Sequence, residues 1–219
     1  MNATDQSYRY IVIEGPIGVG KTTLTRRVAE SLGGELLLEA AEENPFLERF
    51  YENPRHAALP TQLHFLFQRV RQLEPLNQAD LFRPLCIADF LLEKDRLFAH
   101  LNLDEHEREL YDQIWATLSP RAPAPDLVVY LQAPVPVLME RIARRARPCE
   151  SRLDGDYLER LSAAYLDFFH HYSGAPVLIV NAAEANFERS DADYTALLQE
   201  IADRPRGRRY FNPLPVTLS

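Results

Sequence analysis

A glycine-rich loop near the start of the chain constrains the fold more than any other feature of the sequence. The loop runs from Gly15 to Thr22 as Gly-Pro-Ile-Gly-Val-Gly-Lys-Thr, and an apolar run at 8–13 precedes it. The segment 22–32 that follows carries apolar residues at helical spacing. A strand, such a loop and a helix in this order are the context in which a P-loop binds nucleotide phosphates. We therefore expect a nucleoside triphosphate to bind here.

The predicted phosphate contacts come from backbone and side-chain groups of this loop. Gly15 and Gly20 allow backbone conformations that a side chain would forbid, so successive N–H groups can point at the phosphates. Lys21 is expected to reach the β and γ phosphates as a catalytic cation, and the hydroxyl of Thr22 is expected to ligate Mg²⁺. The predicted ATP-binding residues are Gly15, Pro16, Ile17, Gly18, Val19, Gly20, Lys21, Thr22 and Thr23.

The rest of the chain alternates between apolar runs and segments with a helical pattern. The further runs, none of which alternates between apolar and polar residues, are 35–38, 85–88, 127–131 and 177–180. Such runs are typical of strands covered on both faces. We therefore predict one α/β P-loop domain over 1–202, built as a five-stranded parallel sheet flanked by helices. Residues 203–219 are rich in arginine and proline, and we expect them to form a C-terminal tail that is disordered or laid over a neighbour.

Composition excludes several classes of partner. A net charge of -8 argues against general nucleic-acid binding, which relies on clustered Lys and Arg. No apolar run approaches the roughly 20 residues of a membrane span, and residues 1–7 lack the apolar core of a secretory signal. Cys86 and Cys149 are isolated thiols without metal-type spacing, which suits a reducing compartment. We expect a cytoplasmic protein that binds neither nucleic acid nor membrane.

Polar residues at the ends of two predicted strands indicate where the phosphate acceptor binds. Glu39 closes the run at 35–38, and Asp89 closes the run at 85–88. Ligands of open parallel sheets bind at the carboxyl ends of strands. A carboxylate at Glu39 could accept a proton from an attacking hydroxyl, the alternative being a solvated Glu after a strand. Asp89 could contribute to a magnesium shell or serve as a structural carboxylate.

Two further segments carry groups suited to a nucleotide substrate. Gln62 and Arg69 lie seven residues apart in a predicted helix at 61–76, so they share one face. An amide offers the paired donor and acceptor that the edge of a nucleobase requires. The arginines of 141–147 could stabilise charge on a phosphoryl group in transfer. The alternatives are an exposed helix Gln, an ordinary surface ion pair of Arg69 with Asp95, and a solvated basic helix end.

On these residues the chain resembles the deoxynucleoside kinase family, over about 8–187. The stretch 39–51, from Glu-Ala-Ala-Glu-Glu-Asn-Pro to Phe-Tyr, is similar to the bacterial members. The resemblance implies that Glu39 is the general base for the 5′-hydroxyl of a deoxynucleoside and that Tyr51 binds the 3′-hydroxyl. It also implies that Gln62 binds the base and that Arg69 assists.

The resemblance extends to an arginine-rich lid at about 141–152. It implies catalytic roles for Arg141, Arg145 and Arg147, and it places Glu150 on the 3′-hydroxyl of the substrate. Asp95 matches an aspartate that pairs with the base-side arginine in the deoxycytidine kinase branch. We also expect Asp89 to be one of the substrate-binding residues. Family members are usually homodimers, so the resemblance implies the same assembly here.

One residue departs from the family. Most members carry an arginine directly after the acidic residue of the third strand, where this chain has Phe90. Either another arginine supplies that contact or the rate of transfer is low. The resemblance favours an ATP-dependent deoxynucleoside kinase. The alternatives are a nucleoside monophosphate kinase of thymidylate type and a regulatory nucleotide-binding protein with weak transfer activity.

Overall fold

The computed structural model describes residues 8–77, 84–119, 122–147, 150, 153–183, 185, 187 and 190–213. Its strands form one parallel sheet in the order β2-β3-β1-β4-β5-β6. The strands are β1 (Tyr10–Glu14), β2 (Glu35–Leu37), β3 (Cys86–Ala88), β4 (Leu127–Gln132), β5 (Val177–Asn181) and β6 (Arg208–Phe211).

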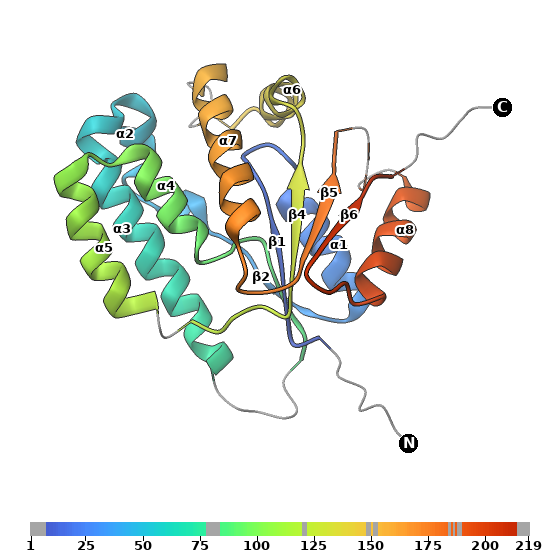
Figure 1. The fold of residues 1–219 in the computed structure, drawn as a ribbon. Coiled ribbons are helices and arrows are strands. Elements are labelled where there is room, and N and C mark those ends of the chain that lie inside the picture. The colour runs from blue at the N-terminus through green and yellow to red at the C-terminus, as the bar shows by residue number, and fades with distance from the viewer. Residues whose placement is uncertain are drawn as a thin grey trace.

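Helices cover both faces of the sheet, and a group of them extends beyond the β2 edge (Figure 1). Helices α1 and α8 lie on one face and α7 on the other, while α2 to α5 pack together beside the sheet. The helices are α1 (Lys21–Leu32), α2 (Leu47–Glu52), α3 (Pro54–Leu73), α4 (Lys94–Asn102), α5 (Glu105–Leu118), α6 (Val135–Arg145), α7 (Gly155–His171) and α8 (Asp191–Ala202), with short 3₁₀ turns η1 (Ala41–Glu43) and η2 (Glu74–Asn77).

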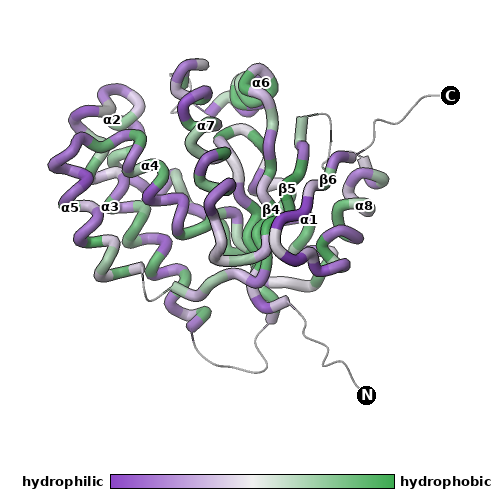
Figure 2. Tube along the Cα trace, viewed as in Figure 1, coloured by the Kyte–Doolittle hydropathy of each residue, from purple (hydrophilic) through white to green (hydrophobic). Residues whose placement is uncertain are grey.

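The core lies between the central strands and the helices on both faces. The strands β1, β3 and β4 are almost fully buried, and Figure 2 shows the apolar colour of β4 at the centre of the molecule. On β4, Tyr130 stacks on Phe169 of α7 at 4.0 Å between ring centroids. The parallel α/β architecture predicted from unalternating apolar runs is therefore confirmed. Among the described residues, none of the helices combines the length and the apolar content needed to cross a membrane.

The predicted number of strands, five, is wrong, because the sheet formed by the described residues has six. The sixth strand, β6, lies within the segment expected to form a tail, and it pairs in parallel with β5. Its residues Arg208 to Phe211 are only partly buried, since β6 lies at the edge of the sheet. Edge strands with charged side chains carry no continuous apolar run, so the pattern used for the other strands did not detect it.

Two other expectations need correction. The strand β2 is not covered on both faces, because it is the opposite edge of the sheet and its residues are exposed or half-buried. Helix α3 begins seven residues before the predicted start and continues through Pro60. A proline inside a helix removes one backbone hydrogen bond, but buried Ala57 and Ala58 anchor the preceding turn. Tertiary packing therefore keeps this segment helical despite the proline.

Candidate active site

A cavity of about 1030 Å³ lies at the carboxyl ends of the central strands. It brings together residues that are far apart in the sequence, from the glycine loop, α2, α3 and the segment 141–150. Of the predicted site residues, only Gly15, Pro16 and Asp95 do not line it. Those that line it are Ile17, Gly18, Val19, Gly20, Lys21, Thr22, Thr23, Glu39, Tyr51, Gln62, Arg69, Asp89, Arg141, Arg145, Arg147 and Glu150.

The glycine loop connects β1 to α1 and uses backbone conformations that favour glycine. Gly18 has a φ of 84°, and a Cβ there would lie 2.7 Å from the side chain of Ile142. A larger residue would therefore collide with α6, which carries the lid residues Arg141 and Arg145. Lys21 Nζ donates to the carbonyl oxygens of Gly15 at 2.6 Å and Pro16 at 3.3 Å. Burial lowers the pKa of Lys21.

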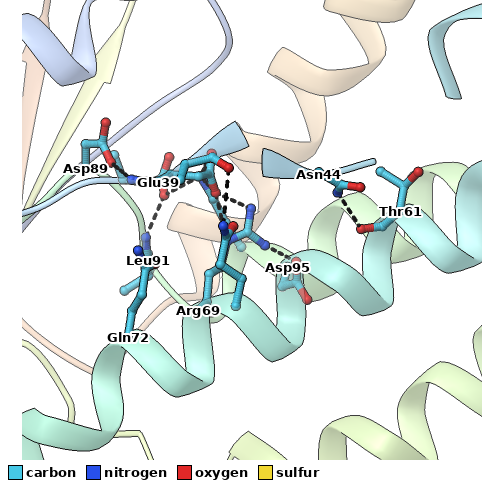
Figure 3. Close-up of polar contacts among 12 residues, drawn as sticks. Glu39, Asn44, Thr61, Arg69, Gln72, Asp89, Leu91 and Asp95 are labelled. Carbon is cyan, nitrogen blue, oxygen red and sulfur yellow. Dashed lines mark hydrogen bonds and ion pairs between the residues drawn. The ribbon is translucent and has the colours of Figure 1, made fainter. Parts of the chain in front are cut away.

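Asp89 connects the glycine loop to the residue expected to act as the base. Its Oδ2 accepts a hydrogen bond from the Thr22 hydroxyl at 2.6 Å, and its Oδ1 accepts one from the Glu39 backbone N–H at 2.7 Å. Figure 3 shows the second of these contacts. A single carboxylate at the end of β3 therefore fixes both the first turn of α1 and the segment that follows β2.

The Glu39 side chain projects into the cavity and is only 19% exposed. Arg69 donates to its Oε1 through Nε at 2.8 Å and through Nη2, and Lys94 Nζ lies 3.3 Å from the same oxygen. Burial raises the pKa of the Glu39 carboxyl, but the charges of Arg69 and Lys94 and the hydrogen bond from Arg69 lower it to about 2. Glu39 is therefore fully ionised at neutral pH.

Arg69 and Asp95 form a buried ion pair, so the alternative of an ordinary surface pair is excluded. The side chain of Asp95 is fully buried, and its Oδ2 also accepts a hydrogen bond from the Tyr111 hydroxyl at 2.8 Å. Figure 3 shows Arg69 placed between Glu39 and Asp95. Asp95 does not itself line the cavity, but it holds Arg69, which does.

Gln62 lies on α3, with its side chain at the cavity wall. The residue is only 3% exposed, which excludes the alternative of an exposed helix Gln. Its amide forms no hydrogen bond with another described residue, so its donor and acceptor are free to pair with a ligand. Tyr51, on α2, is half-buried at the same wall and packs edge-on against Phe50.

The lid arginines make contacts of different kinds. Arg141 donates to the carbonyl oxygens of Val19 at 3.1 Å and Ala182 at 2.8 Å, so it bridges the glycine loop and the segment after β5. Arg145 donates through Nε to Glu150 at 3.1 Å, and Arg147 lies 3.9 Å from the same carboxylate. The described part of the predicted lid comprises 141–147 and 150.

Sequence reasoning missed two charged residues at the centre of this arrangement. Glu14 ends β1 and is fully buried, and Lys94 begins α4 at 2% exposure. The available signal for Glu14 was a carboxylate closing an apolar strand directly before the glycine loop. Lys94 offered no comparable signal, because its importance depends on packing between strands that are distant in the sequence.

Comparison with known proteins agrees with this geometry. The family description Deoxynucleoside kinase matches residues 11–204. A deoxyguanosine kinase of Bacillus subtilis is 37% identical over 200 residues, covering 89% of this chain and 96% of the relative. A deoxyadenosine kinase of Dictyostelium discoideum is 30% identical over 211 residues, covering 94% and 82%. A solved structure of deoxyadenosine kinase from M. mycoides, with products dCMP and dCDP, superposes with a TM-score of 0.77 at 25% identity and covers 89% of this chain and 99% of its own. The chain therefore belongs to the deoxynucleoside kinase family.

Proposed function

We propose that this protein transfers the γ-phosphoryl group of ATP to the 5′-hydroxyl of a deoxynucleoside. One observation carries the proposal: a single cavity contains the phosphate loop, an ionised carboxylate at Glu39 and a buried amide at Gln62 that is free to pair. The phosphate loop binds the donor, Glu39 faces the attacking hydroxyl, and the Gln62 amide suits the edge of a base. A phosphorylated acceptor would have no hydroxyl for Glu39 to activate at the 5′ position, so the nucleoside is favoured over the nucleoside monophosphate.

The chemistry follows from the charges around the acceptor. Glu39 accepts a hydrogen bond from the 5′-hydroxyl and orients its oxygen toward the γ phosphorus. With a pKa of about 2, the carboxylate is a weak base in the resting enzyme. The hydroxyl becomes acidic as its bond to phosphorus forms, so the proton moves to Glu39 late in the reaction. Lys21 and the lid arginines Arg145 and Arg147 stabilise the charge on the phosphoryl oxygens.

Tyr51 and Glu150 complete the proposed sugar site. Both line the cavity together with Glu39, and their oxygens suit the 3′-hydroxyl of the deoxyribose. Glu150 is held by Arg145, so binding of the sugar and placement of a lid arginine are linked.

The proposed cofactor is Mg²⁺, and the residues at the start of α1 fit it. Thr22 and Asp89 offer a hydroxyl and a carboxylate oxygen 2.6 Å apart, beside the phosphate loop. Mg²⁺ is typically bound by one or two protein oxygens together with substrate phosphates and water. Consistent with this, the described residues contain no cluster of three or more acidic, His or Cys side chains that would hold a metal without the nucleotide. When bound, the ion neutralises charge on the β and γ phosphates.

A direct assay tests the proposed function. The purified protein is incubated with Mg²⁺-ATP and each of the four deoxynucleosides, and the 5′-monophosphates are separated by chromatography. Deoxyguanosine and deoxyadenosine are the first candidates, because relatives carry those names. Product with at least one deoxynucleoside is the expected result. Phosphorylation of added monophosphates alone would favour the thymidylate-type reaction, and ATP binding without any product would favour a regulatory role.

Replacing Gln62 by Leu should weaken deoxynucleoside binding selectively. The substitution removes the amide while keeping a similar volume, so the base loses about two hydrogen bonds of roughly 1–1.5 kcal/mol each. We expect the KM for the deoxynucleoside to rise by about 30- to 150-fold, with the KM for ATP unchanged. Steady-state kinetics with each substrate varied in turn measures both constants. Gln113→Leu, at an exposed position of α5, serves as the control. An equal rise in both KM values would contradict a base-binding role.

The proposal includes a homodimer in the cytoplasm. Two large apolar side chains are exposed on neighbouring helices, Phe67 on α3 and Leu110 on α5. Burying such side chains against a second copy would remove apolar surface from water. Sedimentation velocity of the purified protein determines the assembly. The compartment is proposed because Cys86 is a free buried thiol, as is usual in reducing surroundings.

A further inference from the structure

The Lys94 ammonium group lies between the last residue of β1 and the residue proposed as the base. Its Nζ is 3.5 Å from Glu14 Oε2 and 3.3 Å from Glu39 Oε1. Lys94 is in the first turn of α4 and lines the cavity. A lysine is rarely buried to this degree unless paired, and this one is paired with two carboxylates from different parts of the sheet.

Glu14 contacts the loop that binds the phosphate donor, whereas Glu39 lies where the acceptor is proposed to bind. Glu14 Oε1 accepts a hydrogen bond at 2.8 Å from the N–H of Gly15, the first residue of the phosphate loop. Its Oε2 accepts another at 2.8 Å from Leu91, in the segment that leads to α4. Glu39 faces the acceptor. Lys94 therefore connects the donor loop with the acceptor carboxylate through two ion pairs.

The end of β3 supplies no cation of its own in this chain. Phe90, directly after Asp89, is fully buried and contributes to the hydrophobic core. Lys94 is four residues further along, and its side chain reaches the Glu39 carboxylate. Lys21 lies close enough to Lys94 for the two charges to interact. The charge of Lys94 therefore adds to the positive potential at the proposed site of phosphoryl transfer.

We propose that Lys94 is a positioning residue for phosphoryl transfer, which holds Glu39 at a fixed distance from the phosphate loop and supplies positive charge beside it. The inference rests on the proposed kinase function. Lys94 acts through Glu39 and Glu14, and not by binding the base or the adenine of ATP. Loss of its charge should therefore slow the chemical step and leave the affinity for both substrates nearly unchanged.

The test compares Lys94→Met and Lys94→Arg with the wild type. Misplacement of a reacting group by about 1 Å lowers rates on the order of 10²-fold, so we expect Lys94→Met to lose about that factor in kcat. The KM values for ATP and for the deoxynucleoside should stay within about threefold. Lys94→Arg keeps the positive charge, so its kcat should be at least tenfold higher than that of Lys94→Met. Arg96→Met, which removes a half-exposed cation two residues away that pairs with Asp112, is the matched control.

The possible results separate this inference from the proposed function. A wild-type protein that phosphorylates no deoxynucleoside overturns both. With an active wild type, the inference is overturned by a Lys94→Met kcat within threefold of normal, or by a Lys94→Arg variant no more active than Lys94→Met. Thermal melting of the variants identifies a purely structural role. A Lys94→Met variant with a lower melting temperature and raised KM values for both substrates would also overturn the inference.

Discussion

Glu39→Gln is expected to lower kcat by at least about 10²-fold, with little change in the KM for the deoxynucleoside. The amide cannot take a proton from the 5′-hydroxyl, and its NH₂ group would face the donors of Arg69 and Lys94. Steady-state and single-turnover kinetics with the preferred deoxynucleoside measure the effect. Single-turnover data are needed because they separate the chemical step from product release.

The matched control for this substitution is Glu43→Gln, which makes the same change of charge at an exposed position in η1. It should leave kcat within about twofold. A Glu39→Gln enzyme with near-normal turnover would remove Glu39 from the role of base. A loss found only in the KM would instead assign Glu39 to substrate binding.

The lowered pKa of Glu39 also determines the expected pH dependence. Because that pKa is about 2 and its ordinary value is 4.5, protonation of Glu39 should cause no decline in kcat/KM near pH 4.5. A carboxyl whose pKa is lower in the folded state stabilises the fold above its unfolded pKa, and this contribution is lost as the pH falls toward 2. The difference in unfolding free energy between wild type and Glu39→Gln should therefore be constant above about pH 5 and shrink below it. Denaturant titrations at a series of pH values measure this difference.

The fold was largely predictable because its signals are local. The glycine loop and the apolar strands depend on residues close together in the sequence. β6 was missed because an edge strand needs no apolar run, and the correct start of α3 was missed because packing of the turn before Pro60 decides it. These are the places where tertiary context overrides local preference.

Fewer features of the candidate site than of the fold could be predicted from the sequence. Residues that line the cavity and lie in recognisable motifs, such as Gln62, could be identified from the sequence. The residues that hold them could not. Glu14 and Lys94 act through contacts between the ends of β1, β2 and β3, and such contacts depend on the order of strands in the sheet. Asp95 was identified by resemblance, but only the structure shows that its side chain is fully buried and paired with Arg69.

Arg69→Met is expected to destabilise the fold strongly as well as to impair catalysis. The arginine pairs with Glu39 on one side and with fully buried Asp95 on the other. Removing one partner of a buried ion pair costs about 3–5 kcal/mol, because the remaining charge keeps its burial and loses its counter-ion. For a chain of this size, a loss of that order lowers the melting temperature by about 10 °C. Calorimetry measures the shift, and Arg71→Met, at an exposed position on α3, is the control.

A double variant separates the two consequences of losing Arg69. Arg69→Met with Asp95→Leu removes both buried charges, and apolar replacements of a buried pair are often close to neutral. We expect most of the lost melting temperature to return, while kcat stays low because Glu39 still lacks the cation that donates to its Oε1. Recovery of both properties would mean that Arg69 serves only to neutralise Asp95. A melting temperature for Arg69→Met equal to that of Arg71→Met would show that the Arg69–Asp95 pair does not stabilise the fold.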